Sequence, residues 1–220
     1  SSLDISQNNN LNYLNCESNS LTYLDVSQNN NLNYLNCGAN LLSNLDVTNN
    51  LNLSYLNFYS GFSDPCACNS ISNIDLTNNT LLTSLICGGN PLSTIDLSNN
   101  ILLEYLNIIN DPIWLMNNIS NIDLTNNVNL KRFDSEYIGL TSLDLSQNTS
   151  LESLYCRNNL LTTLDLSSNT NLTYLNCMDN QLTDLDLRNG NNISLTYMST
   201  YNNQNLTCIS VDDPSWSINN

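Results

Sequence analysis

Leucine and isoleucine recur along the chain at short, regular intervals, in two related patterns that alternate. In residues 140–159, LTSLDLSQNTSLESLYCRNN, the first pattern is Leu-x-x-Leu-Asp-Leu and the second is Leu-x-x-Leu-x-Cys. The same order returns every 21 residues, as the spacings from Cys16 to Cys37 and from Cys156 to Cys177 show. The triplets Leu-x-Cys and Leu-Asp-Leu each predict a short strand that buries every second side chain. The repeating unit is therefore LxxLxCxxNxLxxLDLSxNxx.

These turns predict a mainly β solenoid over residues 1–204, with about ten 21-residue turns and little or no α-helix. Asparagine at the end of each half bends the chain and satisfies backbone groups there. Two short parallel sheets are expected to face each other across a leucine core. Insertions lengthen two turns, near residues 59–68 and 110–116. The turns begin at Leu11, Leu32, Leu53, Leu82, Leu103, Leu130, Leu151 and Leu172, with a half-turn before them and a degenerate turn from Ile193 or Leu195.

The cysteines of the repeat occupy one inward slot between leucines, so we expect them to be buried, reduced thiols. Side chains in such a ladder run parallel, which disfavours disulfides between turns. No metal site is expected, because the chain has no His and no Cys-x-x-Cys pair. Cys66 and Cys68, in the first insertion, could pair with each other, or Cys66 could take the ladder slot. The slot residues are Cys16, Cys37, Phe58, Cys87, Ile108, Ser135, Cys156 and Cys177.

A second file consists of one aspartate in each turn, on the outer side of the Leu-Asp-Leu strands. Like charges at about 4.8 Å repel, so we expect the Ser or Thr two residues on, and nearby backbone N–H groups, to cap each carboxylate. Binding of Ca²⁺ along the row is the functional alternative, although one file of aspartates supplies few of the oxygens that Ca²⁺ requires. The row comprises Asp4, Asp25, Asp46, Asp75, Asp96, Asp123, Asp144, Asp165 and Asp186.

The outer face of the other predicted sheet varies from turn to turn and is rich in Tyr and Asn. Such residues are common in recognition surfaces, although Tyr also covers sheets for purely structural reasons. The arginines could meet an anionic ligand or pair with Asp134, Glu136 or Asp179. Trp114, in the second insertion, could contact a ligand or fill the gap that the insertion opens. The candidate ligand-binding residues are Tyr13, Tyr34, Tyr55, Tyr59, Tyr105, Asn107, Trp114, Arg132, Tyr155, Arg157 and Tyr174.

Charge and composition narrow the function classes. The chain has 4 basic and 20 acidic residues, for a net charge of −16, which argues against nucleic acid and against polybasic membrane binding. No apolar run approaches the roughly 20 residues that span a bilayer, so no membrane insertion is expected. The lack of His removes ordinary Ser-His-Asp and Cys-His catalysis. A non-catalytic, monomeric binding module without a cofactor is the prediction.

The 21-residue unit resembles a leucine-rich repeat, and its Cys-x-x-Asn variant is similar to the cysteine ladder of internalin J-type bacterial proteins. Residues 205–217, NLTCISVDDPSWS, resemble the segment that closes such arrays in proteins secreted by the type IX route. The resemblance implies a C-terminal cap at 205–220, in which Cys208 would lack its partner, so we expect a piece of a longer protein. It also implies an extracellular or cell-surface adhesin that binds a protein or polysaccharide. A structural spacer is the alternative, and ice binding by the second sheet is a further one.

Overall fold

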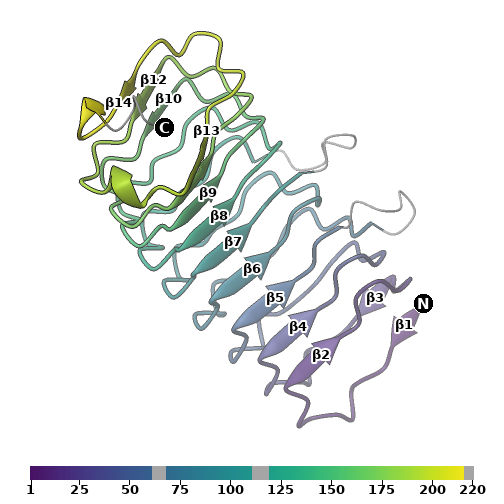
Figure 1. Cartoon of the computed structure of the whole chain (residues 1–220). Coiled ribbons are helices and arrows are strands. Elements are labelled where there is room, and N and C mark those ends of the chain that lie inside the picture. Colours follow the sequence, from purple (N-terminus) through teal and green to yellow (C-terminus); the bar gives the residue numbers. More distant parts are fainter. Residues whose placement is uncertain (61–67, 111–118, 216–220) are drawn as a thin grey trace.

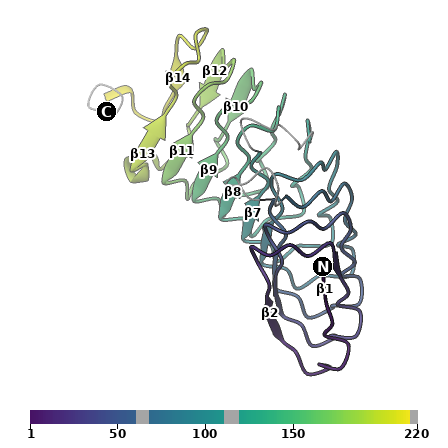
Figure 2. The same ribbon diagram turned by 90° about the vertical axis from the view of Figure 1, so that its right-hand side faces the viewer.

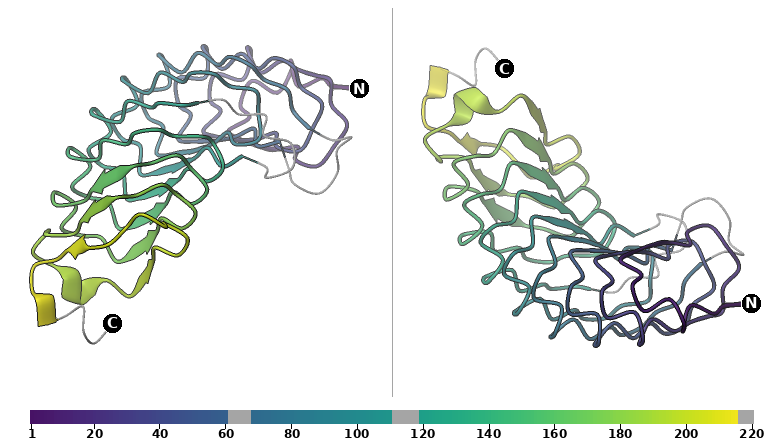
Figure 3. Two further views of the ribbon diagram at one scale, coloured as in Figure 1. Left: turned by 90° about the horizontal axis from the view of Figure 1, so that it is seen from above. Right: turned by 90° about the horizontal axis from the view of Figure 1, so that it is seen from below.

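A computed structural model describes residues 1–60, 68–110 and 119–215 of the chain. The chain winds into a curved solenoid whose two ends lie at opposite ends of the coil (Figures 1 and 3). The predicted leucine-rich-repeat solenoid is confirmed. A 3₁₀ turn, η1, spans Asn192–Ser194. The described part of the chain contains no helix with the length and hydropathy of a bilayer-spanning segment.

Within the described residues, the first half of each turn contributes one three-residue strand to a nine-stranded sheet. Every pairing is parallel and in register, for example Tyr34 with Tyr55 and Leu35 with Leu56. The strands lie in chain order across the sheet, as expected when each turn stacks on the one before it. They are β2 (Tyr13–Asn15), β4 (Tyr34–Asn36), β5 (Tyr55–Asn57), β6 (Ser84–Ile86), β7 (Tyr105–Asn107), β8 (Arg132–Asp134), β9 (Ser153–Tyr155), β11 (Tyr174–Asn176) and β13 (Tyr197–Ser199).

The Leu-Asp-Leu halves form strands only near the two ends of the described solenoid. At the N-terminal end, β1 (Ser2–Leu3) pairs with β3 (Tyr23–Leu24). At the other end, β10 (Thr163–Asp165), β12 (Asp184–Asp186) and β14 (Ile209–Ser210) form a three-stranded sheet. The nine-stranded sheet lies on the inner side of the curve (Figure 2). Between the two ends, outer half-turns are joined by isolated backbone hydrogen bonds, such as Ser70 N–H to the Leu42 carbonyl oxygen at 2.7 Å, and form no strand pair within the described residues. The second predicted sheet is therefore interrupted.

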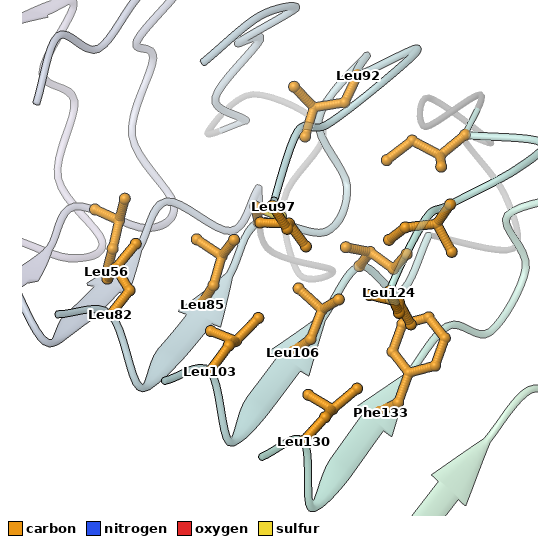
Figure 4. Close-up of a cluster of buried hydrophobic side chains, with 14 of the residues drawn as sticks. Leu56, Leu82, Leu85, Leu92, Leu97, Leu103, Leu106, Leu124, Leu130 and Phe133 are labelled. Carbon is orange, nitrogen blue, oxygen red and sulfur yellow. The ribbon is translucent and has the colours of Figure 1, made fainter. Parts of the chain in front are cut away.

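Leucines from both halves of each turn fill the interior (Figure 4). Leu56, Leu85 and Leu106, at the centres of successive strands, are fully buried. The ladder cysteines Cys16, Cys37, Cys87, Cys156 and Cys177 are also buried and form no disulfide, as predicted. Burial raises the pKa of these five thiols, so they remain protonated and act as small apolar side chains. Phe58 fills the same slot in its turn.

Buried asparagines hold neighbouring turns together. Asn159 donates from Nδ2 to the carbonyl oxygens of Ser135 (2.8 Å) and Cys156 (2.9 Å), and its Oδ1 accepts the Leu140 N–H at 3.0 Å. In the other half-turn, Asn148 donates to the carbonyl oxygens of Leu124 and Asn127, at 3.1 and 2.9 Å. Equivalent bonds recur in the neighbouring turns. Asn side chains thus satisfy backbone groups where the chain bends away from a sheet.

Candidate functional site

The outward side of the nine-stranded sheet presents one column of mostly aromatic residues, which we name the tyrosine face. In each strand the central residue points into the core, so the first and third residues point outward. The strand register aligns the first residues from turn to turn, and each aligned position is one rung of the column. In order the rungs are Tyr13, Tyr34, Tyr55, Ser84, Tyr105, Arg132, Ser153, Tyr174 and Tyr197.

The N-terminal rungs form a stack of three rings. The ring centroids of Tyr13 and Tyr34 are 4.3 Å apart with planes inclined by 12°, and those of Tyr34 and Tyr55 are 4.2 Å apart with planes inclined by 7°. Burial between the neighbouring rings raises the pKa of Tyr34 to about 12, and the hydroxyls of Tyr55 and Tyr13 add to this to a smaller extent. The ring faces therefore contact one another, while ring edges and hydroxyls face outward.

The C-terminal rungs include a guanidinium between two rings. The Arg132 Cζ atom lies 5.2 Å from the ring centroid of Tyr105 and 4.8 Å from that of Tyr155, distances typical of cation–π contacts. Tyr155 belongs to the third-residue column, but its ring stacks on Tyr174 at 4.5 Å. Tyr174 then stacks on Tyr197 at 4.4 Å. Tyr155 thus supplies the ring that Ser153 lacks.

A buried carboxylate holds the centre of this run. Asp134 is 1% exposed. Arg132 donates to it through Nε, at 2.9 Å to Oδ1, and through Nη2, at 2.9 Å to Oδ2. The Tyr105 hydroxyl donates to Oδ2 at 2.9 Å and accepts from Asn107 Nδ2 at 3.0 Å. Burial raises the pKa of Tyr105 to about 12. These charge-assisted bonds fix both the Tyr105 ring and the guanidinium.

Beside this centre, Arg157 faces three neighbours. Its Nε lies 3.9 Å from Asp179 Oδ2, and its Cζ lies 5.5 Å from the ring centroid of Tyr137. Tyr137 has a φ of +60°, an unusual conformation for a bulky residue. Burial raises the pKa of Glu136, although the Arg157 charge opposes this. Of the two alternatives for the arginines, pairing with acidic neighbours is present: Arg132 binds Asp134 and Arg157 lies within ion-pair distance of Asp179. Lys131 pairs with Glu104 at 2.9 Å.

The asparagines of the third-residue column have a structural role. The Oδ1 atoms of Asn36, Asn57 and Asn107 accept N–H bonds from the residues two positions later, at 3.2, 2.9 and 3.1 Å. These bonds form where the chain leaves the strand. Asn36 also donates to Glu17 Oε2 at 2.8 Å. Several Asn amide groups on this face therefore make hydrogen bonds within the protein itself.

The aspartate row is capped as predicted. In each of its nine residues, Oδ1 accepts the N–H of the residue two positions later, at 2.9–3.0 Å. Thr48, Thr77 and Thr125 add hydroxyl bonds at 2.7 Å. Hydrogen bonds from the residue two positions after each aspartate lower the pKa of eight carboxyls: Asp4, Asp25, Asp46, Asp75, Asp96, Asp123, Asp144 and Asp186. Calcium binding stays a hypothesis.

The structure brings most of the candidate ligand-binding residues onto one face. Tyr13, Tyr34, Tyr55, Tyr105, Asn107, Arg132, Tyr155 and Tyr174 lie on outward strand positions, and Tyr59 and Arg157 follow β5 and β9. Their role in binding stays a prediction. Trp114, Cys66 and the pairing of Cys66 with Cys68 lie outside the described residues. Tyr197 was missed in the sequence analysis because the last turn is two residues longer than the 21-residue repeat. The motif Tyr-Met-Ser, which matches the Tyr-Leu-Asn of other strands, is the signal that could have placed it beside Tyr174.

Comparisons with known proteins agree with this geometry. A family model for two copies of leucine-rich repeats matches residues 149–189. The functional domain of internalin J from Listeria monocytogenes, which includes a cysteine ladder, is 35% identical, with a TM-score of 0.70. The match covers 93% of this chain and 47% of that one. The chain is a leucine-rich-repeat protein. It resembles internalin J and spans about half the length of that structure.

More distant structures share the fold of this leucine-rich-repeat protein. One is a leucine-rich-repeat protein of Leptospira interrogans, at 20% identity and a TM-score of 0.60, with 99% of this chain and 72% of that chain covered. Another is the plant peptide hormone receptor RGFR1 in complex with RGF2, at 16% identity and a TM-score of 0.65, with coverage of 96% and 37%. A search of curated proteins found no significant match. Solenoids of this kind commonly bind proteins on their concave surfaces.

Proposed function

We propose that this solenoid is a non-catalytic binding module of an extracellular or cell-surface protein, which recognises a protein partner through the tyrosine face. The observation that carries the proposal is the preordered centre formed by Tyr105, Arg132, Asp134 and Tyr155. Tyr and Arg are the residues that most often dominate binding energy at protein interfaces. Because their rings and guanidinium are already fixed, little side-chain entropy is lost when a partner docks.

A protein fits this face better than a polysaccharide does. Sugars commonly pack on exposed faces of aromatic rings, whereas within the two tyrosine stacks rings 4.2–4.5 Å apart cover one another's faces. Ring edges and hydroxyls remain outward, which suits the polar and apolar mixture of a protein surface. The net charge of −16 favours a basic partner surface through electrostatic steering. Adhesion through a protein partner is the function we infer.

A structural spacer in a cell-surface protein is the second candidate. It is favoured by the asparagine and aspartate side chains, most of which serve the fold itself. A spacer would have no measurable ligand and would tolerate changes on both faces. Ice binding has less support, because it calls for a flat, regular second sheet and the described Leu-Asp-Leu strands pair only near the ends.

The test is a binding screen against extracellular proteins, with a glycan array beside it, on the wild-type chain and two double variants. Tyr34→Ala with Tyr174→Ala removes one ring from each aromatic run. Asn44→Ala with Thr162→Ala changes two exposed side chains in the other half-turns and serves as the matched control. We expect a tenfold or greater loss of affinity for a protein partner in the first variant only. Equal binding by all three folded chains would refute the proposal. Binding only on the glycan array would show that the partner is a glycan and not a protein.

A further inference from the structure

We propose that the Ser84 rung is a slot for one aromatic side chain of the partner protein, which inserts between the rings of Tyr55 and Tyr105. This inference rests on the proposed function and names the group that the tyrosine face receives. Ser84 pairs with Tyr55 on one side and Tyr105 on the other, so two aromatic rungs flank a small residue. All three residues are partly exposed.

The spacing of the rungs suits a single ring. Neighbouring strands lie about 4.8 Å apart, so Tyr55 and Tyr105, two strands apart, have about 9.6 Å between their rungs. A ring midway would lie about 4.8 Å from each neighbour, within the usual range for aromatic pairs. Within the same column, Tyr13, Tyr34 and Tyr55 already pack at 4.2–4.3 Å. The solenoid thus sets the period that an inserted ring would continue.

The column has three rungs without tyrosine, and the protein fills two of them itself. At Arg132 the guanidinium lies between the rings of Tyr105 and Tyr155. At Ser153 the ring of Tyr155 leans in from the third-residue column and stacks on Tyr174. At Ser84 the third-column residue is Ile86, which has no planar group to offer. Among the described rungs of the tyrosine face, Ser84 therefore lacks a planar group of its own.

Both walls of this slot are held in place before a ligand arrives. Tyr55 stacks on Tyr34. Tyr105 packs against Arg132 and is fixed through its hydroxyl by Asp134 and Asn107. These ring contacts are with Tyr34 and Arg132, on the side of each ring away from the Ser84 rung. A preordered slot lets an inserted ring gain two stacking contacts without first moving the walls.

The chemistry beside the slot favours an aromatic ring over an arginine. In the Arg132 rung, the buried Asp134 carboxylate balances the guanidinium charge. The matching position beside Ser84 is Ile86, and the half-buried Ile109 follows in the next turn. Gly88 adds no side chain, because a Cβ there would lie 2.1 Å from the Ile109 carbonyl oxygen. A guanidinium would enter this apolar setting without a carboxylate, which is unfavourable.

The first experiment fills the slot from within the chain. Ser84→Tyr should place the introduced ring between Tyr55 and Tyr105 and raise the melting midpoint by about 2–4 °C relative to Ser84→Ala. Nuclear Overhauser contacts should join it to both neighbouring rings. Ser72→Tyr, at an exposed site in the other half-turn, is the control and should leave the midpoint unchanged. A fall in the midpoint, or absence of contacts to both rings, would show that the slot does not exist.

The second experiment uses N-acetyl-tryptophan amide and N-acetyl-arginine amide as probes of the full chain by NMR. The tryptophan probe should shift the ring resonances of Tyr55 and Tyr105, but not those of Tyr13, and Ser84→Tyr should abolish the shifts. No shift up to the solubility limit, or larger shifts with the arginine probe, would overturn the aromatic assignment.

The same variant separates this inference from the proposed function. With a partner from the binding screen, Ser84→Tyr should lower affinity at least tenfold, whereas Ser84→Ala and Ser72→Tyr should bind as the wild type does. If Tyr34→Ala with Tyr174→Ala weakens binding but Ser84→Tyr does not, the tyrosine face binds the partner and the slot inference is wrong. If neither variant weakens binding, both proposals fail.

Discussion

The tyrosine face and the aspartate row both repeat one residue type from turn to turn, but they make different contacts. Each aspartate accepts a bond from a backbone N–H two residues later, within its own turn. Each tyrosine rung packs against rungs of other turns. Repetition in the aspartate row therefore reflects how one turn bends. A substitution on the tyrosine face changes a surface shared by several turns, so that face can carry specificity.

The contrast is greatest in the turn that begins at Leu130. On its first half, the usual Tyr, Asn and Cys positions hold Arg132, Asp134 and Ser135, and the later Asn slot holds Ile138. On its second half, Leu143-Asp144-Leu145 keeps the repeat unchanged, and Asp144 keeps its cap. One turn thus departs from the repeat on the tyrosine face while it obeys the repeat on the aspartate row. Two aspartates of this turn allow a matched test.

The largest expected effect is the difference between Asp134→Ala and Asp144→Ala. Asp134→Ala removes the carboxylate to which Arg132 and the Tyr105 hydroxyl donate. The free energy of unfolding should therefore fall by about 2–3 kcal/mol. Loss of Asp144 removes one exposed cap and should cost about 1 kcal/mol or less, because water can replace it. Urea unfolding of both variants measures the difference.

The isosteric variant Asp134→Asn serves as a control. It keeps the shape of the side chain and loses the charge, so its unfolding free energy should lie between those of the wild type and Asp134→Ala. Equal costs for Asp134→Ala and Asp144→Ala would show that the central network adds no stability beyond an ordinary cap, and the contrast between the two faces would be lost.

The repeat makes most of the fold predictable from sequence. A single alignment on the ladder cysteines places the inward leucines, the buried thiols and the aspartate caps, because each depends on contacts within one turn or between identical neighbours. Cys156 and Asp144 therefore take the roles that their spacing predicts. Arg132 and Tyr155 could likewise be placed on one face.

The features that sequence could not place depend on several turns at once. The interruption of the outer sheet depends on how successive turns stack, which is a property of several turns together. The central network depends on burial of Asp134 beneath Arg132 and Tyr105, and three different residues from two strands must meet to form it. The stack at Ser153 depends on the lean of Tyr155 from one column into another. None of these has a signal in the 21-residue period.

A smaller effect is expected from Glu136→Gln, next to the tyrosine face. Burial raises the pKa of Glu136 in the folded state, so ionisation there reduces stability at pH values above the folded pKa. This reduction disappears below the usual pKa of about 4.5. The variant should therefore be more stable than the wild type at pH 7 and equal to it near pH 3.5. Urea midpoints at the two pH values measure this, and a variant less stable at pH 7 would show that attraction to Arg157 outweighs burial.

The aspartate row should respond in the opposite sense. Its lowered pKa values mean that capping stabilises the fold at pH values above about 3.8 and that this contribution is lost as the pH falls through the folded pKa values. Asp144→Asn should therefore reduce stability at pH 7 and make little difference in acid. Opposite pH dependences for Glu136→Gln and Asp144→Asn would sharpen the distinction between a buried carboxylate and a capped, exposed one.

The smallest expected effect concerns calcium on the aspartate row. Each Oδ1 already accepts a backbone N–H, and among the described residues no cluster of three or more acidic, Cys or His side chains could hold a metal ion. Ca²⁺ normally takes six to eight oxygens. Millimolar Ca²⁺ should therefore leave the melting midpoint within about 1 °C of its value in chelator, by calorimetry at fixed ionic strength. A larger rise in the melting midpoint, if Asp96→Asn removes it, would show that the aspartate row binds calcium.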